Sequence, residues 1–129
     1  MTCGYGYVLR MEIPELADLI WLFEGQPKRN HEDLEWPLGL HSFSLKRGAT
    51  EILFSLDPLA GEAFISLFVD VEEVAMLGNL RRLGRVSVER EPDYEGLTLW
   101  FDIDSQVPIK IQTKPSIRVS WYLKRLGAW

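Results

Sequence analysis

Residues 86–103 read VSVEREPDYEGLTLWFDI, and this stretch decides the fold. Apolar residues alternate with polar ones on both sides of a loop, residues 91–96, that contains proline, aspartate and glycine. A period of two sends successive side chains to opposite faces of a strand. The stretch therefore predicts an antiparallel hairpin with one apolar and one polar face.

The same alternation continues toward the C-terminus, over residues 109–112 and 117–124. Together with the hairpin, these segments predict a meander of four strands. Upstream, residues 40–46 also alternate, whereas residues 51–56 and 63–69 are apolar runs separated by turn residues. The two runs predict a hairpin covered on both faces. The prediction is an antiparallel sheet of six or seven strands.

Two other segments favour helices. Pro14 suits a first helical position, and Leu16, Leu19, Ile20 and Phe23 form an apolar stripe before Gly25. Residues 70–84 resemble a capped helix, because Asp70 precedes Glu73 by three positions and leucines follow at intervals of three. We therefore expect an α+β fold in which two helices pack on one face of the sheet.

Composition agrees with one soluble domain. The chain has 129 residues, of which 47% are hydrophobic and 26% charged, and these are ordinary values for a globular domain. We expect a single domain over residues 1–129, with residues 1–10 loosely attached. Cys3 is the single cysteine, so we expect no disulfide and a cytoplasmic location.

Charge is unevenly distributed along the chain. The net charge is −5, which argues against a general nucleic-acid binder. Residues 1–80 hold 13 acids and 5 bases, a balance of −8, whereas residues 81–129 hold 6 acids and 9 bases, a balance of +3. One acidic cluster comprises Asp70, Glu72 and Glu73. The C-terminal part can therefore present a basic face despite the acidic total.

Catalytic and metal-binding motifs are weak. The chain contains no G-x-S-x-G, H-E-x-x-H or C-x-x-C sequence. Residues 31–35, His-Glu-Asp-Leu-Glu, are the best metal candidate, but a firm site needs a further ligand placed in space. We interpret them as a solvated loop, and the pair Asp102 and Asp104 as surface acids. We predict no catalytic site, no metal and no cofactor.

Aromatic residues carry the strongest binding signal. Five of them occupy positions predicted to point inward and are interpreted as core: Phe54, Phe64, Phe68, Phe101 and Trp121. Trp100 and Tyr122 fall on the polar faces of their strands, on the same side as Lys110, Arg118 and Lys124. Exposed Trp and Tyr residues are common in binding hot spots. The alternative is that another element covers this face and makes it a second core.

The acidic hairpin loop is a second candidate contact. Glu91, Asp93, Tyr94 and Glu95 combine carboxylates with one aromatic ring, which suits a basic protein surface and speeds encounter by electrostatic steering. The alternative is a soluble turn that discourages edge aggregation.

These features indicate a non-enzymatic module that binds a protein partner, which we expect to be basic. The small, acidic, tryptophan-rich chain is similar in profile to bacterial immunity proteins, which bind and block a toxin. That resemblance covers no specific motif. The alternative is a pocket lined by Trp and Phe that binds a small molecule or performs acid/base chemistry through Asp102 or His41. Self-association through an edge strand is a third hypothesis.

Overall fold

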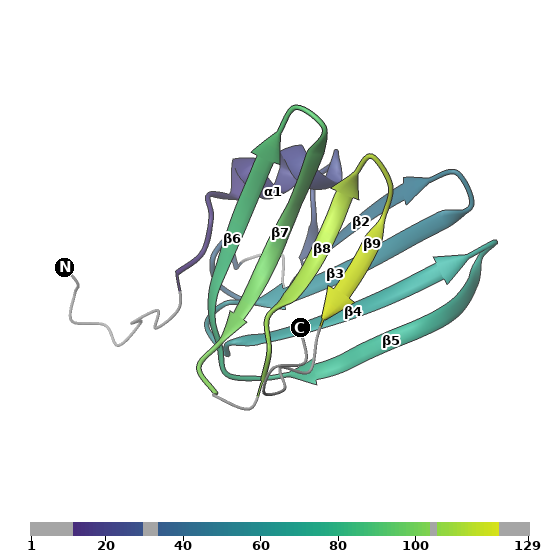
Figure 1. Cartoon of the computed structure of the whole chain (residues 1–129). Helices are drawn as coiled ribbons and strands as arrows, with labels where there is room; N and C mark the ends of the chain where they lie inside the picture. The colour runs from purple at the N-terminus through teal and green to yellow at the C-terminus, as the bar shows by residue number, and fades with distance from the viewer. Residues whose placement is uncertain (1–11, 30–33, 104–105, 122–129) are drawn as a thin grey trace, which may run out of the picture.

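The structure is a computed structural model, and it describes residues 12–29, 34–103 and 106–121. One helix and nine strands lie in these ranges (Figure 1). In chain order they are α1 (Leu16–Phe23), β1 (Lys28–Arg29), β2 (His41–Arg47), β3 (Thr50–Asp57), β4 (Glu62–Val69), β5 (Glu72–Leu80), β6 (Leu83–Glu91), β7 (Tyr94–Phe101), β8 (Ile109–Lys114) and β9 (Arg118–Trp121).

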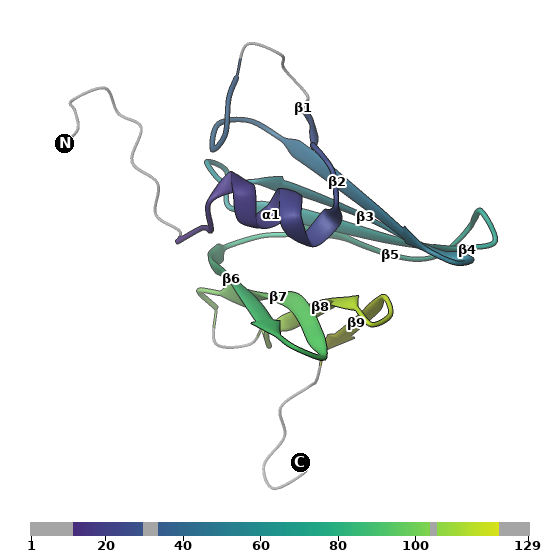
Figure 2. The same cartoon turned by 90° about the horizontal axis from the view of Figure 1, so that it is seen from above.

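The strands form two antiparallel sheets rather than the predicted single sheet. The first sheet has five strands in the order β1-β2-β3-β4-β5, and the second has four in the order β6-β7-β8-β9. Within each sheet every strand pairs with its neighbour in sequence, so both sheets are meanders, and the predicted C-terminal meander is confirmed. Figure 2 shows the two sheets as stacked layers, with α1 at one end of the stack.

The predicted helix over residues 70–84 is wrong. Asp70 and Val71 form a turn, and residues 72–80 continue as strand β5, paired with β4. Two register shifts interrupt this pairing, so the inward-facing residues Leu77 and Leu80 lie three positions apart instead of two. A bulge adds one residue to a strand. That extra residue explains why the sequence imitates a helical period.

Helix α1 confirms a helix that ends at Phe23, but it begins at Leu16 with Glu15 as its N-cap, so Pro14 lies before the helix and not at its first position. Its buried residues are Leu19, Leu22 and Phe23. The Phe23 ring centroid lies 5.4 Å from that of Phe43 on β2 and 5.8 Å from that of Phe54 on β3. On its other side, Asp18 pairs with Arg90 of β6. The helix therefore contacts both sheets instead of covering one face of a single sheet.

The hydrophobic core lies between the sheets and is shared by them. It includes Ile52 and Ile65 of the five-stranded sheet and Leu97 and Ile111 of the four-stranded sheet. The predicted cover on both faces of β3 and β4 is wrong, because Leu53 on the opposite face of β3 is exposed. Each sheet consequently keeps one outward face.

The aromatic residues predicted as core divide into three groups. Phe54 is fully buried. Phe101 is half-buried against the same core. The inward orientation predicted for Phe64 and Phe68 is wrong, because both alternate with the core residues Ala63 and Ile65 and lie half-buried on the outward face of the five-stranded sheet. Trp121 is exposed, although its register partner is the buried Ile109, because β9 is the edge strand of its sheet. The alternation predicted the correct face for Trp121, but it could not predict that the residue lies on an edge strand.

Candidate protein-binding surface

The outward face of the four-stranded sheet carries three of the predicted binding residues. Arg85 lies opposite Trp100, and Gln112 lies opposite Arg118. These positions alternate with buried residues such as Leu99 and Ile111, so their side chains point away from the core. The structure thus places Trp100, Lys110 and Arg118 on one face, as the alternation predicts. Tyr122 and Lys124 lie outside the described residues.

Trp100 is held in place while part of its surface stays exposed. Its exposed fraction is 36%. The indole Nε1 donates a hydrogen bond to Ser87 Oγ at 2.9 Å, and Arg85 Cζ lies 4.7 Å from the ring centroid. A cation over an exposed ring contributes about 0.5–1 kcal/mol. A ring fixed in this way loses little conformational entropy when a partner covers it.

The β6–β7 tip is shorter than the predicted loop. Only Pro92 and Asp93 separate the strands, and both Glu91 and Asp93 are exposed. Tyr94 is half-buried, and its hydroxyl donates to Glu89 Oε1 at 3.3 Å. Burial and the Glu89 carboxylate raise the pKa of Tyr94, so the phenol keeps its proton at neutral pH. The tip therefore presents two free-standing acids beside an anchored phenol.

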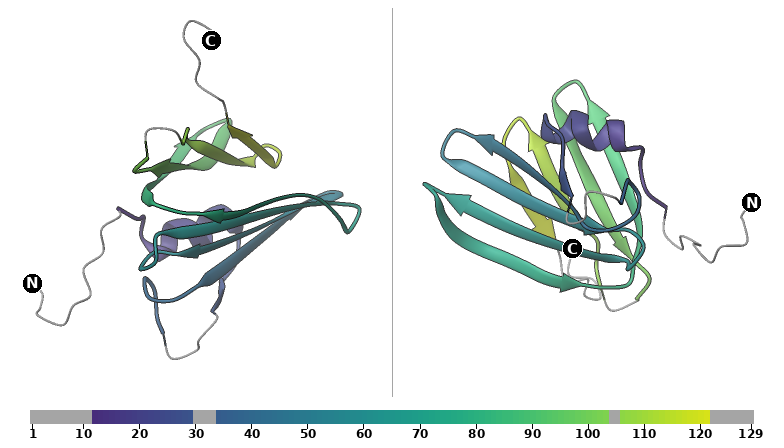
Figure 3. Two further views of the ribbon diagram at one scale, coloured as in Figure 1. Left: turned by 90° about the horizontal axis from the view of Figure 1, so that it is seen from below. Right: turned by 180° about the vertical axis from the view of Figure 1, so that it is seen from behind.

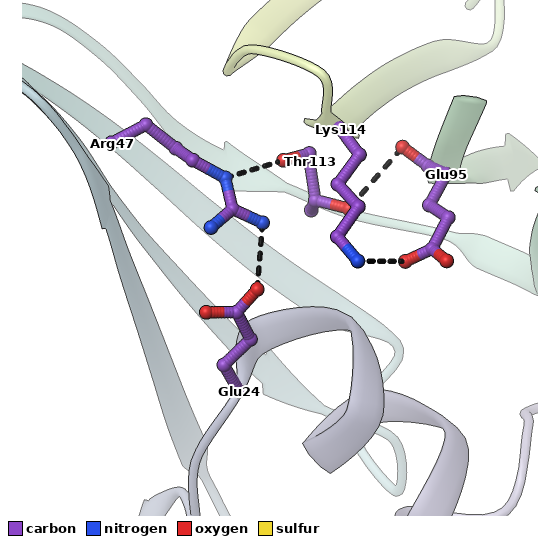
Figure 4. Close-up of polar contacts among 5 residues, drawn as sticks. All are labelled: Glu24, Arg47, Glu95, Thr113 and Lys114. Carbon is purple, nitrogen blue, oxygen red and sulfur yellow. Dashed lines mark hydrogen bonds and ion pairs between the residues drawn. The ribbon is translucent and has the colours of Figure 1, made fainter. Parts of the chain in front are cut away.

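Glu95 does not lie on this exposed tip. Its side chain is only 14% exposed, and Oε1 lies 3.9 Å from Lys114 Nζ (Figure 4). The neighbouring Thr113 donates to the Glu95 carbonyl, and its own carbonyl accepts from Arg47 Nε of β2 at 3.0 Å. Arg47 also pairs with Glu24 at 2.7 Å, where α1 ends. Glu95 thus belongs to a polar cluster that joins the two sheets to the helix.

Trp21 is an exposed aromatic residue that the sequence analysis missed. It lies on α1 with an exposed fraction of 55%. Arg90 Cζ lies 5.1 Å from its ring centroid, and Arg90 also pairs with Asp18 at 2.9 Å. Position 21 falls outside the stripe formed by Leu16, Leu19, Ile20 and Phe23. The helical period therefore contained the signal, because a tryptophan off the apolar stripe faces solvent.

Two concave sites bear on the small-molecule hypothesis. The larger, a groove of about 790 Å³, is lined by both sheets and contains one aromatic residue, Tyr94. The smaller, about 390 Å³, is lined by residues that include Trp36 and His41. His41 is buried, and its Nδ1 donates to the Gly39 carbonyl at 3.2 Å. Asp102 is exposed and lines neither site.

Metal-binding clusters and membrane-spanning helices are both absent from the described part of the chain. In residues 12–29, 34–103 and 106–121, no group of three or more His, Cys, Asp or Glu side chains is close enough to hold a metal ion. Residues 31–33 of the metal candidate lie outside these ranges. No helix among the described residues has the length and apolar character needed to cross a membrane.

Comparison with known proteins gives one informative similarity. The sequence matches no family model and no curated protein. The structure is similar to a chain of a contact-dependent growth inhibition toxin–immunity protein complex from Klebsiella pneumoniae 342. The TM-score is 0.71 at 13% sequence identity, and the match covers 89% of this chain and 98% of that chain. At this identity the likeness establishes a shared fold over nearly the whole chain.

Proposed function

We propose that this chain is a non-enzymatic immunity protein that binds a toxin in the bacterial cytoplasm and blocks it. The observation that carries the proposal is the shared fold with a chain of a toxin–immunity complex, over 98% of that chain. Fold alone does not determine function. The exposed and pre-ordered Trp21 and Trp100 rings add a second line of support, because such anchors are typical of binding hot spots.

Between the two components of such a complex, net charge favours the immunity role. The chain carries −5 overall, and the exposed residues Glu91 and Asp93 suit a basic partner. Expression of this chain alone in bacteria separates the roles. An immunity protein leaves growth unchanged, whereas a toxin arrests it. Growth arrest would refute the proposal.

The direct test is neutralisation of a toxin encoded beside the gene for this chain. We expect co-expression to restore growth and the two proteins to co-purify in a fixed ratio. Substitution Trp100→Ala is expected to weaken the complex by at least about tenfold, as for an aromatic hot spot. Leu59→Ala changes an exposed apolar residue in the β3–β4 turn and serves as the control. A Trp100→Ala variant that folds normally but no longer protects against the toxin would support the outward face of the four-stranded sheet as the binding surface.

The acidic tip is best tested without Glu95. Because that residue belongs to the polar cluster with Lys114, its replacement disturbs the contact between strands as well as the surface. We therefore expect Glu91→Ala with Asp93→Ala to weaken binding while the melting temperature stays constant. Unchanged affinity in this double variant would exclude the tip as a contact.

The smaller pocket keeps small-molecule binding as a second candidate function. Trp36 meets the His41 ring edge-on at 5.3 Å, which places an aromatic wall beside a buried imidazole. A thermal-shift screen with metabolites tests this candidate. A specific ligand raises the unfolding temperature by several degrees, and a His41→Phe variant would lose that shift.

A further inference from the structure

The end of the β4–β5 hairpin is an apolar projection. We call residues 69–76, which comprise the end of β4, the turn and the start of β5, the finger. It reaches beyond the rest of its sheet in Figure 1, and Figure 3 shows the same projection from two other sides. Val71 is 84% exposed, Met76 67% and Val74 59%. Apolar groups this exposed gain free energy when a partner removes them from water.

The finger tip holds a residue type that its backbone disfavours. Asp70 and Val71 have φ of 52° and 62°, so both are left-handed. A two-residue hairpin turn of this kind favours Asn-Gly or Asp-Gly, and a β-branched residue there is a rare and strained outlier. The β2–β3 turn of the same chain meets its left-handed position with Gly48 at φ 60°. Val71 therefore destabilises the turn, and it is the most exposed of the large apolar residues in the hairpin.

The finger has a single sign of charge. Asp70, Glu72 and Glu73 are all exposed, and residues 69–76 contain no lysine or arginine. Carboxylates around exposed valines match an apolar pocket surrounded by basic residues. A membrane with anionic lipids would repel the same surface.

The base of the finger continues into the groove between the sheets. Val69 and Val74 line this groove together with Ile117 and Val119 from the opposite sheet. A partner that surrounds the tip would therefore also meet the apolar surface of Val69 and Val74 at the base of the finger.

The pairing of β5 argues against docking by strand addition. A register shift between Leu67 and Phe68 leaves Val74 without an opposite residue on β4. A bulge of this kind twists an edge strand and discourages a further strand, whether from another protein or from a second copy. The finger thus offers side chains rather than a long backbone edge.

We propose that the finger inserts Val71 and its apolar neighbours into a pocket, rimmed by Lys or Arg, on the protein that this chain binds. This inference rests on the proposed function. It names the partner chemistry as a basic protein surface with an apolar depression, and it identifies Val71 as the residue at the centre of the contact.

The test uses Val71→Gly in the full chain, against the neutralised toxin. Glycine relieves the left-handed strain but removes the side chain, so folding and binding should change in opposite directions. We expect a higher melting temperature together with an affinity at least about tenfold weaker. Leu59→Gly controls for loss of an exposed apolar side chain in a turn.

The outcomes separate the two proposals. If the wild-type chain binds no toxin, the proposed function and this inference both fail. If the wild type binds and Val71→Gly binds equally well, the function stands and the finger is refuted. A concentration-dependent dimer that Val71→Gly abolishes, with toxin affinity unchanged, would assign the finger to self-association and would also overturn the inference.

Discussion

Phe23 is expected to be the residue through which α1 stabilises the fold. The ring is 2% exposed and packs against Phe43 and Phe54 at centroid distances of 5.4 and 5.8 Å. Replacing a buried phenylalanine by alanine costs about 3–5 kcal/mol, because transfer free energy is lost and a cavity remains. For a chain of this length, each kcal/mol lowers the melting temperature by about 3–5 °C. Phe23→Ala should therefore lower it by about 10–20 °C.

The neighbouring helix positions supply matched controls. Trp21→Ala removes a larger ring that is 55% exposed, and we expect a loss of about 1 kcal/mol or less, mostly from its contact with Arg90. Urea denaturation followed by circular dichroism measures both variants. A double-mutant cycle with Phe54→Ala should show coupling between the two rings of about 0.5–1.5 kcal/mol. Equal losses for Phe23→Ala and Trp21→Ala would refute the packing of α1 against the five-stranded sheet.

Two further variants test the close backbone contact between β7 and β8 and the ion pair between the end of α1 and β2. Gly96→Ala should unfold readily in thermal denaturation, because a Cβ there would clash with the Ile111 carbonyl oxygen, and backbone cannot move aside cheaply. A melting temperature near wild type would contradict the close approach of β7 and β8. Arg47 holds the pKa of Glu24 below its ordinary value of 4.5, so their ion pair stabilises the fold at neutral pH and this contribution fades as the pH falls below that value. Glu24→Gln should therefore cost less than about 1 kcal/mol at pH 7, since the pair is exposed, and less again at pH 3, as measured by denaturant titration at both values.

The sequence predicted strands wherever alternation was regular. Residues 86–89 and 97–101 alternate regularly, and they lie in the hairpin of β6 and β7 with the expected buried face. β5 was missed because its pairing is irregular. Bulges displace Leu77 and Leu80 from a period of two, and the Asp70–Val71 turn carries the residues of a helix cap. A period of two in the sequence therefore identifies a strand only where the strand pairs with its neighbour without bulges.

The division into two sheets was beyond the reach of the hydrophobic pattern. Alternation identifies the buried face of a strand but not the sheet to which the strand belongs. The change of sheet occurs at Arg81 and Arg82, between β5 and β6, where Arg82 adopts a φ of 62°. A hairpin turn and a crossing between layers are both short polar segments. In the structure they are distinguished by the buried Leu83, whose N–H donates to the carbonyl of Gly61 at 3.1 Å where β6 begins.

The candidate site was predictable to the extent that exposure followed from alternation. Trp100 is exposed as expected, and Asp93 lies in a turn as expected. Glu95 lies only two positions after Asp93 of the turn, yet its side chain is largely buried beside Lys114. Neighbouring residues on a strand face opposite ways, so Glu95 does not share the face of Tyr94. The exposure of Trp21 could have been predicted from the same helical period, because position 21 lies on the polar side of the helix and not in its apolar stripe.

The uneven charge along the sequence acquires a spatial meaning in the fold. Two ion pairs connect the acidic part with the basic part, Asp18 with Arg90 and Glu62 with Arg81, so part of the imbalance stabilises contacts within the chain. The acids of the finger and of the β6–β7 tip face solvent at ends of different sheets, whereas Lys110 and Arg118 occupy the outward face between β7 and the sheet edge. A basic partner is attracted to the first two surfaces and repelled by the third. For a basic partner the apolar finger, which carries acids alone, is therefore the better candidate for the centre of the interface.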